Sequence, residues 1–250
     1  MADNNKKHKH GIEITTPFHH SIPVQLRFND IDILGHLNNS VYFTLFDLGK
    51  TQYFNAVRGE QIDWMTADIV IANVNCDFMA QTFYHEPLEV RTQTLKMGEK
   101  SIVLAQQVYN SDTGEVKAQC TCVMVSFDIL GHLNNSVYFT LFDLGKTQYF
   151  NAVRGEQIDW MTADIVIANV NCDFMAQTFY HEPLEVRTQT LKMGEKSIVL
   201  AQQVYNSDTG EVKAQCTCVM VSFDIATGLS KPLAEHWRTS LQAFEQRPLA

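Results

Sequence analysis

Apolar and polar positions along the first half of the chain predict one short strand, one helix and four further strands. Apolar and polar residues alternate over residues 22–28, which predicts a strand. Four later runs have the apolar, β-branched character of strands: residues 69–78, 88–96, 101–109 and 116–127. Turns at residues 97–100 and 112–114 would join the last three as antiparallel hairpins. One helix followed by a run of antiparallel strands predicts an α+β fold.

The predicted helix begins near Asn38 or Asn39, because asparagine is a strong N-cap. It continues to about Phe54 with apolar residues almost all round, so we expect it to be buried. Gly49 lies inside this stretch and weakens a helix by about 1 kcal/mol. Close packing of the helix against a sheet would explain a glycine there.

The same pattern occurs twice, because residues 32–129 and residues 128–225 are identical letter for letter, 96 positions apart. A natural repeat drifts, first at exposed positions. The duplication is therefore recent, engineered or an error in the sequence. Without one copy the chain would have 154 residues, a normal size for one domain.

The duplication predicts two units with tails at both ends. We expect a disordered tail over residues 1–20, a first unit over 21–127, a second unit over 128–225, and a C-terminal tail over 226–250 with a short helix near residues 234–244. The second unit lacks a first strand of its own. Residues 116–127 keep the right period to replace it, which leaves open which unit owns that strand.

Composition narrows the class of protein. The chain is 45% hydrophobic and 19% charged, with a net charge of −9, as expected for a soluble globular protein. An acidic chain is a poor partner for nucleic acid or an anionic membrane, and no apolar run is long enough to span a bilayer. The N-terminus has no apolar segment of the secretory type, so we expect a cytoplasmic protein.

The six cysteines are three positions counted twice, and we expect reduced thiols. Cys120 and Cys122 share one face of a predicted strand. That spacing alone is weak evidence for zinc, and no second pair of ligands stands near. We therefore expect core cysteines and no metal site.

Residues 29–42 read Asn-Asp-Ile-Asp-Ile-Leu-Gly-His-Leu-Asn-Asn-Ser-Val-Tyr. This segment resembles the Asp-x-x-Gly-His-x-Asn-Asn-x-x-Tyr signature of hotdog-fold acyl-CoA thioesterases, and most closely the 4-hydroxybenzoyl-CoA thioesterase family. The resemblance covers about residues 20–127, and again 128–225. It implies a hotdog fold, in which an antiparallel sheet wraps a central helix. The chain departs from the family at His85-Glu86-Pro87, where many relatives have Gly-Asp, so we expect an altered pocket rim.

The residues themselves suit thioester hydrolysis, which needs a base or nucleophile and a group that holds the developing oxyanion. Acid help is less important, because the leaving thiol has a pKa of about 8.5. Asp32 lies seven residues before Asn39, and the free amides and dipole of a helix start suit an oxyanion. The resemblance implies that Asp32 is the catalytic carboxylate and that the amide near Asn39 polarises the carbonyl. The matching positions in the second unit are Asp128 and Asn135.

Each candidate has a simpler structural alternative. Asp32 would then bond loop amides, and the asparagines would only cap the helix. His36 and its copy His132 would orient the loop or the substrate, or only make a structural hydrogen bond. Asp47, in mid-helix, is expected only to pair with Lys50 or Thr51. The candidate substrate-binding residues are Asn38, Tyr42, Lys96 and Lys100, with their copies Asn134, Tyr138, Lys192 and Lys196.

The lysines flank a hairpin turn, where they would meet the phosphates of coenzyme A or simply face solvent.

Four functions stay open. The first is a thioesterase for acyl-CoA or an acyl carrier protein, with no cofactor because coenzyme A is part of the substrate. The second is a non-catalytic hotdog that binds acyl thioesters. A dehydratase is disfavoured because a His-Phe-Pro type of motif is absent, and the last is a duplicated chain with no activity of its own. We expect self-association of hotdog units, here as a pseudo-dimer within one chain.

Overall fold

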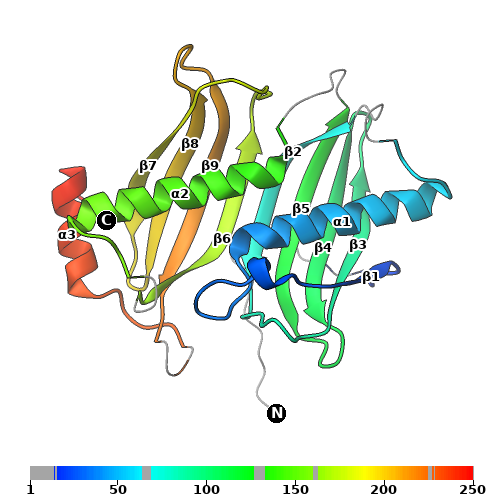
Figure 1. The fold of residues 1–250 in the computed structure, drawn as a ribbon, viewed down its shortest axis with the longest axis horizontal. Helices are drawn as coiled ribbons and strands as arrows, with labels where there is room; N and C mark the ends of the chain where they lie inside the picture. The colour runs from blue at the N-terminus through cyan, green and yellow to red at the C-terminus, as the bar shows by residue number, and fades with distance from the viewer. Residues whose placement is uncertain are drawn as a thin grey trace.

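The computed structural model describes residues 14, 16–63, 69–126, 133–159, 163–224, 227 and 229–249. These residues form one antiparallel sheet of nine strands, with two long helices lying across the same face (Figure 1). The strand order is β1-β3-β4-β5-β2-β6-β9-β8-β7. In the part of the chain described, no helix is long and apolar enough to cross a membrane.

Each unit contributes one helix and one block of the sheet. The elements of the first unit are β1 (Ser21–Val24), a 3-10 turn (Phe28–Asp30), α1 (Asn39–Arg58), β2 (Ile69–Phe78), β3 (Leu88–Met97), β4 (Ser101–Asn110) and β5 (Val116–Ser126). Those of the second unit are α2 (Asn135–Arg154), β6 (Ile165–Phe174), β7 (Leu184–Met193), β8 (Ser197–Asn206) and β9 (Val212–Ser222). A last helix, α3 (Glu235–Glu245), runs over the stretch where the sequence predicts a short helix.

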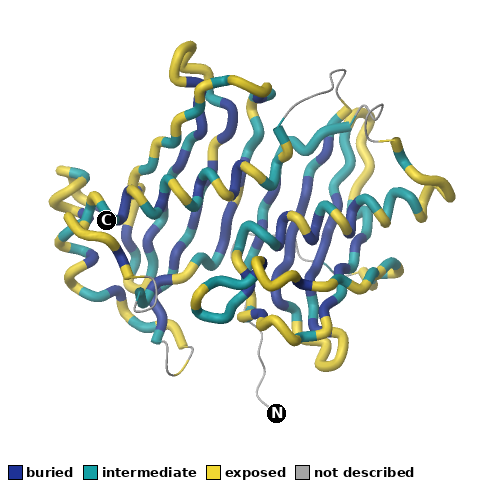
Figure 2. The backbone as a smooth tube through the Cα atoms, in the orientation of Figure 1, coloured by how far each residue is buried: buried dark blue, intermediate teal, exposed yellow. Residues whose placement is uncertain are grey.

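Helix α1 begins where the sequence predicts, with Asn38 as N-cap. A Cβ on Gly49 would lie 2.5 Å from Cγ1 of Val90, so the glycine lets the helix approach the sheet closely, as expected. The prediction of burial all round is wrong. Thr44 and Leu48 form part of an exposed stripe, because only one face of the helix meets the sheet (Figure 2).

The first strand is shorter than the predicted 22–28. It pairs with β3 only over Ser21–Val24. The chain then turns away, because the amide of Arg27 donates to Oδ2 of Asp30 at 2.7 Å and the Arg27 guanidinium pairs with the same carboxylate. These bonds favour the 3-10 turn over further strand pairing.

Strands β2 and β6 join the two units, and their register makes the seam self-complementary. Asn75 lies opposite Asn171, which is its own copy in the second unit. Equivalent residues therefore meet across an approximate twofold axis, the geometry of an isologous interface. On the face of the sheet that carries the helices, the rings of Phe43 in α1 and Phe139 in α2 stack with centroids 3.4 Å apart.

Ownership of β5 is settled by its neighbours. Strand β5 pairs with β4 on one side and with β2 on the other, so the first unit keeps it. It does not serve as a first strand for the second unit. The second unit nevertheless regains equivalent geometry at Leu133, whose amide donates to Thr178 at 2.8 Å, just as Leu37 donates to Thr82 at 2.8 Å.

Candidate functional site

The loop that carries Asp32 is held together by that residue's own side chain. Oδ1 of Asp32 accepts hydrogen bonds from the amides of Leu34 at 2.8 Å and His36 at 3.0 Å. The Asp32 amide donates back to the His36 carbonyl at 2.8 Å, and Gly35 closes the turn with a φ of +82°. Among the described residues nothing donates to Oδ2 of Asp32. The structural role and a free carboxylate oxygen therefore coexist in one half-buried side chain.

This loop is fixed against the start of α1. The Asn38 amide donates to the Asp30 carbonyl at 2.9 Å, and the Leu37 amide donates to the Thr82 carbonyl at 2.8 Å. Asp30 is itself buried and paired with Arg27. The Asp32 loop, the helix start and residues 79–87 thus form one connected assembly.

The first turn of α1 leaves one amide available. The side chain of Asn38 accepts from the Ser40 amide at 3.2 Å, and its carbonyl accepts from Val41 at 3.0 Å. The amide of Asn39 lies between these and has no acceptor among the described residues. The same caps recur at α2, where the Asn134 side chain accepts from the Ser136 amide at 2.9 Å. Each helix start therefore offers an N–H group and the positive end of a helix dipole.

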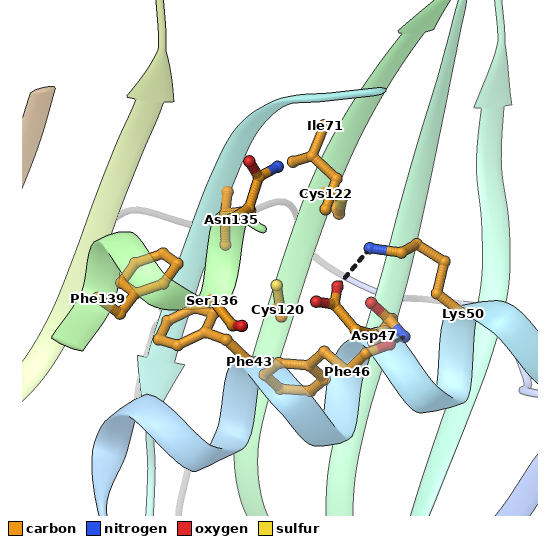
Figure 3. A pocket seen from close by; sticks show the side chains of 12 residues that line it. Phe43, Phe46, Asp47, Lys50, Ile71, Cys120, Cys122, Asn135, Ser136 and Phe139 are labelled. Carbon is orange, nitrogen blue, oxygen red and sulfur yellow. Dashed lines mark hydrogen bonds and ion pairs between the residues drawn. The ribbon is translucent and has the colours of Figure 1, made fainter. Parts of the chain in front are cut away.

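Each helix start opens on a cavity inside the other unit. The cavity of the first unit lies between α1 and the sheet, where Phe46, Asp47 and Ile71 line it, and Asn135 and Ser136 of the second unit close it (Figure 3). It is small in this structure, about 10 Å³, so an acyl group enters only if side chains move.

The second cavity is the counterpart across the twofold axis. Asn39 and Ser40 of α1 close it, and its interior comes from the second unit, including Phe142 and Asp143. Both cavities are bordered by the stacked pair Phe43 and Phe139. Each candidate site therefore needs both units.

A buried ion pair faces each cavity. Nζ of Lys50 lies 2.7 Å from Oδ1 of Asp47, which confirms the predicted pairing, and Lys146 makes the same pair with Asp143 at 2.6 Å. Burial lowers the pKa of Lys50, but the charge and hydrogen bond of the Asp47 carboxylate oppose this, and the net pKa is raised. Lys50 therefore carries its charge inside the protein, where Asp47 is its counter-ion.

The cysteines lie in the core. Cys120 and Cys122 are free and buried on the helix side of β5. Burial raises the pKa of Cys122 to about 12, so its thiol is protonated at neutral pH and is a poor nucleophile. No group of three or more His, Cys, Asp or Glu that could hold a metal occurs in the described part of the chain.

Two motif residues of α1 and its loop contact residues 79–87. The Tyr42 hydroxyl donates to Oγ1 of Thr82 at 2.7 Å, and burial raises the pKa of this phenol. The ring of His36 packs edge-on against Phe83 with centroids 5.2 Å apart. These contacts position the loop, and the described structure shows Tyr42 as a core residue.

The predicted lysines do not lie beside Asp32 of their own unit. Strand β3 begins after the loop that contacts His36 and ends at the turn that Lys96 and Lys100 flank. Ten residues of strand separate these ends by about 30 Å. The lysines are exposed, and so are Lys192 and Lys196.

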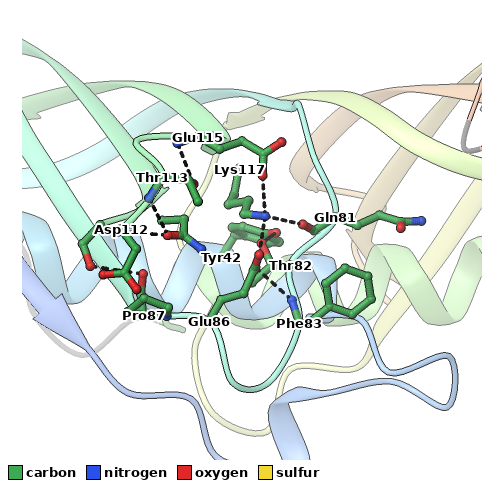
Figure 4. A network of polar contacts seen from close by, with 12 residues as sticks. Tyr42, Gln81, Thr82, Phe83, Glu86, Pro87, Asp112, Thr113, Glu115 and Lys117 are labelled. Atoms are coloured by element: carbon green, nitrogen blue, oxygen red, sulfur yellow. Dashed lines mark hydrogen bonds and ion pairs between the residues drawn. The ribbon is translucent and has the colours of Figure 1, made fainter.

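Sequence reasoning missed a third lysine that positions the site. Lys117 is buried and donates to the carbonyl of Gln81 at 2.8 Å, to Glu86 at 2.7 Å and to Glu115 at 2.8 Å (Figure 4). Glu86 also accepts from the Phe83 amide at 3.1 Å. The departure His85-Glu86-Pro87 is thus part of the network that holds the rim loop. The signal in the sequence was one lysine inside a predicted strand whose other residues are uncharged.

The second unit repeats most of this arrangement. Asn134, Asn135 and Tyr138 take the same positions as their copies, and Tyr138 donates to Thr178 at 2.6 Å. Asp128 and His132 lie outside the described residues. The structure therefore gives the geometry of one complete loop, the one that carries Asp32.

Comparison with known proteins identifies the family. The sequence profile of the thioesterase-like superfamily matches residues 26–130 and again residues 126–241. The uncharacterized protein YsmA of Bacillus subtilis (strain 168) is 31% identical over 94 residues, which are 37% of this chain and 62% of that protein. The long-chain acyl-CoA thioesterase FadM of Escherichia coli (strain K12) is 23% identical over 109 residues, which are 42% of this chain and 81% of that protein.

A solved structure shows the fold. A protein of unknown function with a hot dog fold from Alicyclobacillus acidocaldarius superimposes with a TM-score of 0.58 at 10% identity, and the match covers 82% of this chain and 94% of that one. The chain spans less than two thirds of the length of YsmA. The two profile matches together cover most of the chain, and the nine-stranded sheet holds two tandem hotdog units. The chain belongs to the thioesterase-like superfamily.

Proposed function

We propose that this chain hydrolyses acyl thioesters of coenzyme A or of an acyl carrier protein. The observation that carries the proposal is the assembly at the start of α1. A carboxylate loop is tied to an Asn-capped helix, and that helix start faces a mostly apolar cavity of the other unit. FadM, a long-chain acyl-CoA thioesterase, has a similar sequence over most of its length. No cofactor is needed, because coenzyme A belongs to the substrate.

In the proposed reaction, Asp32 acts as general base or as nucleophile. As a base, its free carboxylate oxygen takes a proton from water while the water oxygen forms a bond to the thioester carbonyl carbon. The Asn39 amide donates to the carbonyl oxygen as it becomes an oxyanion. The oxyanion then collapses, the C–S bond breaks, and the thiolate leaves and takes up the proton.

The acyl group would enter the cavity that Asn39 and Ser40 close, with Phe142 along its wall. We propose that the candidate substrate-binding residues outside the cavity, including Asn38 and the exposed lysines, contact the carrier rather than the acyl group. Six free, buried cysteines fit a reducing compartment, and we propose the cytoplasm.

The alternative is a hotdog that binds acyl thioesters without cleaving them, or a duplicated chain with no activity. The small size of the cavity does not favour the binding protein or the inactive chain over the other. Free-thiol release from a panel of acyl-CoA and acyl carrier protein thioesters tests the proposal, on this chain beside the 154-residue single-copy form. We expect thiol release well above the uncatalysed rate for at least one thioester. Binding of a thioester without thiol release would contradict hydrolysis and favour a binding protein. If the chain neither binds nor cleaves any thioester of the panel, the duplicated chain has no thioesterase activity and the proposal is wrong.

We further propose that the two units act as a pseudo-dimer, because each cavity combines the interior of one unit with the helix start of the other. Limited proteolysis checks this. We expect both units to resist digestion together, with early cuts confined to the chain ends. Rapid digestion to one resistant core of single-unit size would contradict the pseudo-dimer.

A further inference from the structure

The two outer edges of the sheet are sequence-identical but are covered differently. Strand β3 of the first unit is followed in the sheet by β1, whereas β7 of the second unit is the last strand in the order. The duplication copied residues 32–129 and left residues 21–24 single. One chain therefore contains two identical receiving edges and one segment that fits them.

In the first unit, residues 16–24 cover the edge of β3 and bend over the outer face of the sheet. The amide of Thr92 donates to the His20 carbonyl at 3.1 Å, which extends the β1 pairing by one step. Farther along, Nε2 of Gln93 donates to the carbonyl of Thr16 at 3.2 Å. The guanidinium of Arg91 lies 5.0 Å from the ring centre of Phe18.

In the second unit, the residues of β7 that correspond to the covered residues of β3 lack such a covering segment. Leu88, Val90 and Thr92 are buried, with Val90 and Thr92 at 0% exposure. Their copies in β7 are only half-buried: Leu184, Val186 and Thr188. On the outer face, the buried side chains of the first unit also become more exposed in the second: Gln107, Gln119 and Thr121 compared with Gln203, Gln215 and Thr217. Figure 2 shows the more exposed strands at the left-hand end of the sheet.

An open hollow accompanies the difference. A cavity of about 460 Å³ lies on the outer face of the second unit, bordered by Arg187, Gln189 and Gln203. Arg187 and Gln189 are the copies of Arg91 and Gln93, the two residues that contact Phe18 and Thr16 in the first unit.

The C-terminal helix leaves most of this edge free. The contacts of α3 and its following turn with β7 begin at Thr190, whose amide donates to Glu245 at 2.6 Å, and continue to Met193. Phe244 packs on Tyr149 with centroids 5.5 Å apart, as His20 packs on Tyr53 at 5.5 Å in the first unit. No described residue pairs with the edge of β7 from Leu184 to Thr188.

We propose that the open edge of β7 binds residues 16–24 of a second copy of this chain as an added antiparallel strand, after that segment has left the β3 edge of its own chain. Ser21–Val24 would pair with Leu184–Arg187 in the register that β1 adopts on β3. Ile22 and Val24 would cover the exposed parts of Leu184 and Val186, and Phe18 would reach Arg187. The occupant follows from identity: the same segment fills the same surface in the first unit. Added strands of this kind bind through backbone hydrogen bonds and alternate side chains.

The test uses the full chain and a labelled peptide of residues 16–26, followed by fluorescence anisotropy. We expect saturable binding of one peptide per chain, and an Ile22→Asp peptide should not bind. Absence of binding at peptide concentrations up to about 1 mM would overturn the proposal.

A double-mutant cycle then locates the site. On the unchanged chain, a Phe18→Ala peptide should bind about threefold to fivefold more weakly, the effect of one lost cation–π contact. On an Arg187→Ala chain the Phe18→Ala change should cost nothing further. On the matched Arg91→Ala chain the cost should stay at its full value. The opposite pattern would show that the peptide does not occupy β7. In that pattern, the Phe18→Ala change costs no affinity on the Arg91→Ala chain, or costs its full threefold to fivefold on the Arg187→Ala chain.

Discussion

Replacing Asp32 by asparagine is expected to lower kcat/KM for acyl-CoA by about 100-fold or more, the usual contribution of a general base. The substituted amide would still accept hydrogen bonds from Leu34 and His36 through its side-chain oxygen. The loop should keep its shape and lose only the base. An unchanged thermal midpoint, measured beside the kinetics, separates loss of catalysis from loss of structure.

The matched substitution Asp128→Asn is expected to cost much less. Ahead of Asp32, the carboxylate of Asp30 pairs with Arg27 and accepts from its amide. The residues at these positions in the second unit are Ser126 and Val123, both in β5, which the first unit keeps. The second carboxylate therefore lacks that anchor. A misplacement of about 1 Å costs on the order of 100-fold in rate. Equal losses from the two variants, or a larger loss from Asp128→Asn, would contradict this argument.

Replacing Asp47 by asparagine is expected to lower the free energy of unfolding by about 3 kcal/mol, because it leaves the charge of Lys50 buried without its partner. The side chain of Lys50 is only 7% exposed. Denaturant unfolding of the full chain measures the loss. The matched variant Asp143→Asn should cost a similar amount, since Lys146 is also 7% exposed and pairs at 2.6 Å.

A second substitution and a pH series check the cause. Lys50→Met in the Asp47→Asn background removes the unpaired charge and should restore most of the stability. The raised pKa of Lys50 means that the pair stabilises the fold fully below the pKa of unfolded lysine, about 10.4, and that this support is lost as pH rises through the folded pKa. The deficit of Asp47→Asn should therefore shrink at alkaline pH. A deficit that Lys50→Met does not reduce would show that Asp47 acts in some other way.

Local features of the fold could be predicted from sequence because each has a local cause. Asn38 caps α1, and Gly49 marks the close approach of helix and sheet. Apolar runs predicted four strands to within about one residue. The first strand was overestimated, because its alternating pattern continues through Arg27 although Asp30 turns the chain away from the sheet. Side-chain bonds to a turn compete with strand pairing and leave no trace in an apolar pattern.

The candidate site was less predictable, because it depends on how the units meet. A motif could point to Asp32 and Asn39. It could not show that Asn39 closes a cavity lined by Phe142, since that contact requires the pairing of β2 with β6. The role of Lys117 was also hidden, because its partners Glu86 and Glu115 come together only when the rim loop folds over β5. Long-range pairing of identical units cannot be read from either unit alone.

The catalytic role of Asp32 is tested most directly by thiol release from a panel of acyl-CoA thioesters. The enzyme is the double variant Asp32→Asn with Asp128→Asn, beside the unchanged chain. Asparagine at position 32 would keep the acceptor oxygen for the amides of Leu34 and His36, so the thermal midpoint should match that of the unchanged chain. We expect the unchanged chain to hydrolyse at least one thioester and the double variant to fall to the uncatalysed rate. Turnover of that thioester by the folded double variant at the rate of the unchanged chain would contradict the role of Asp32.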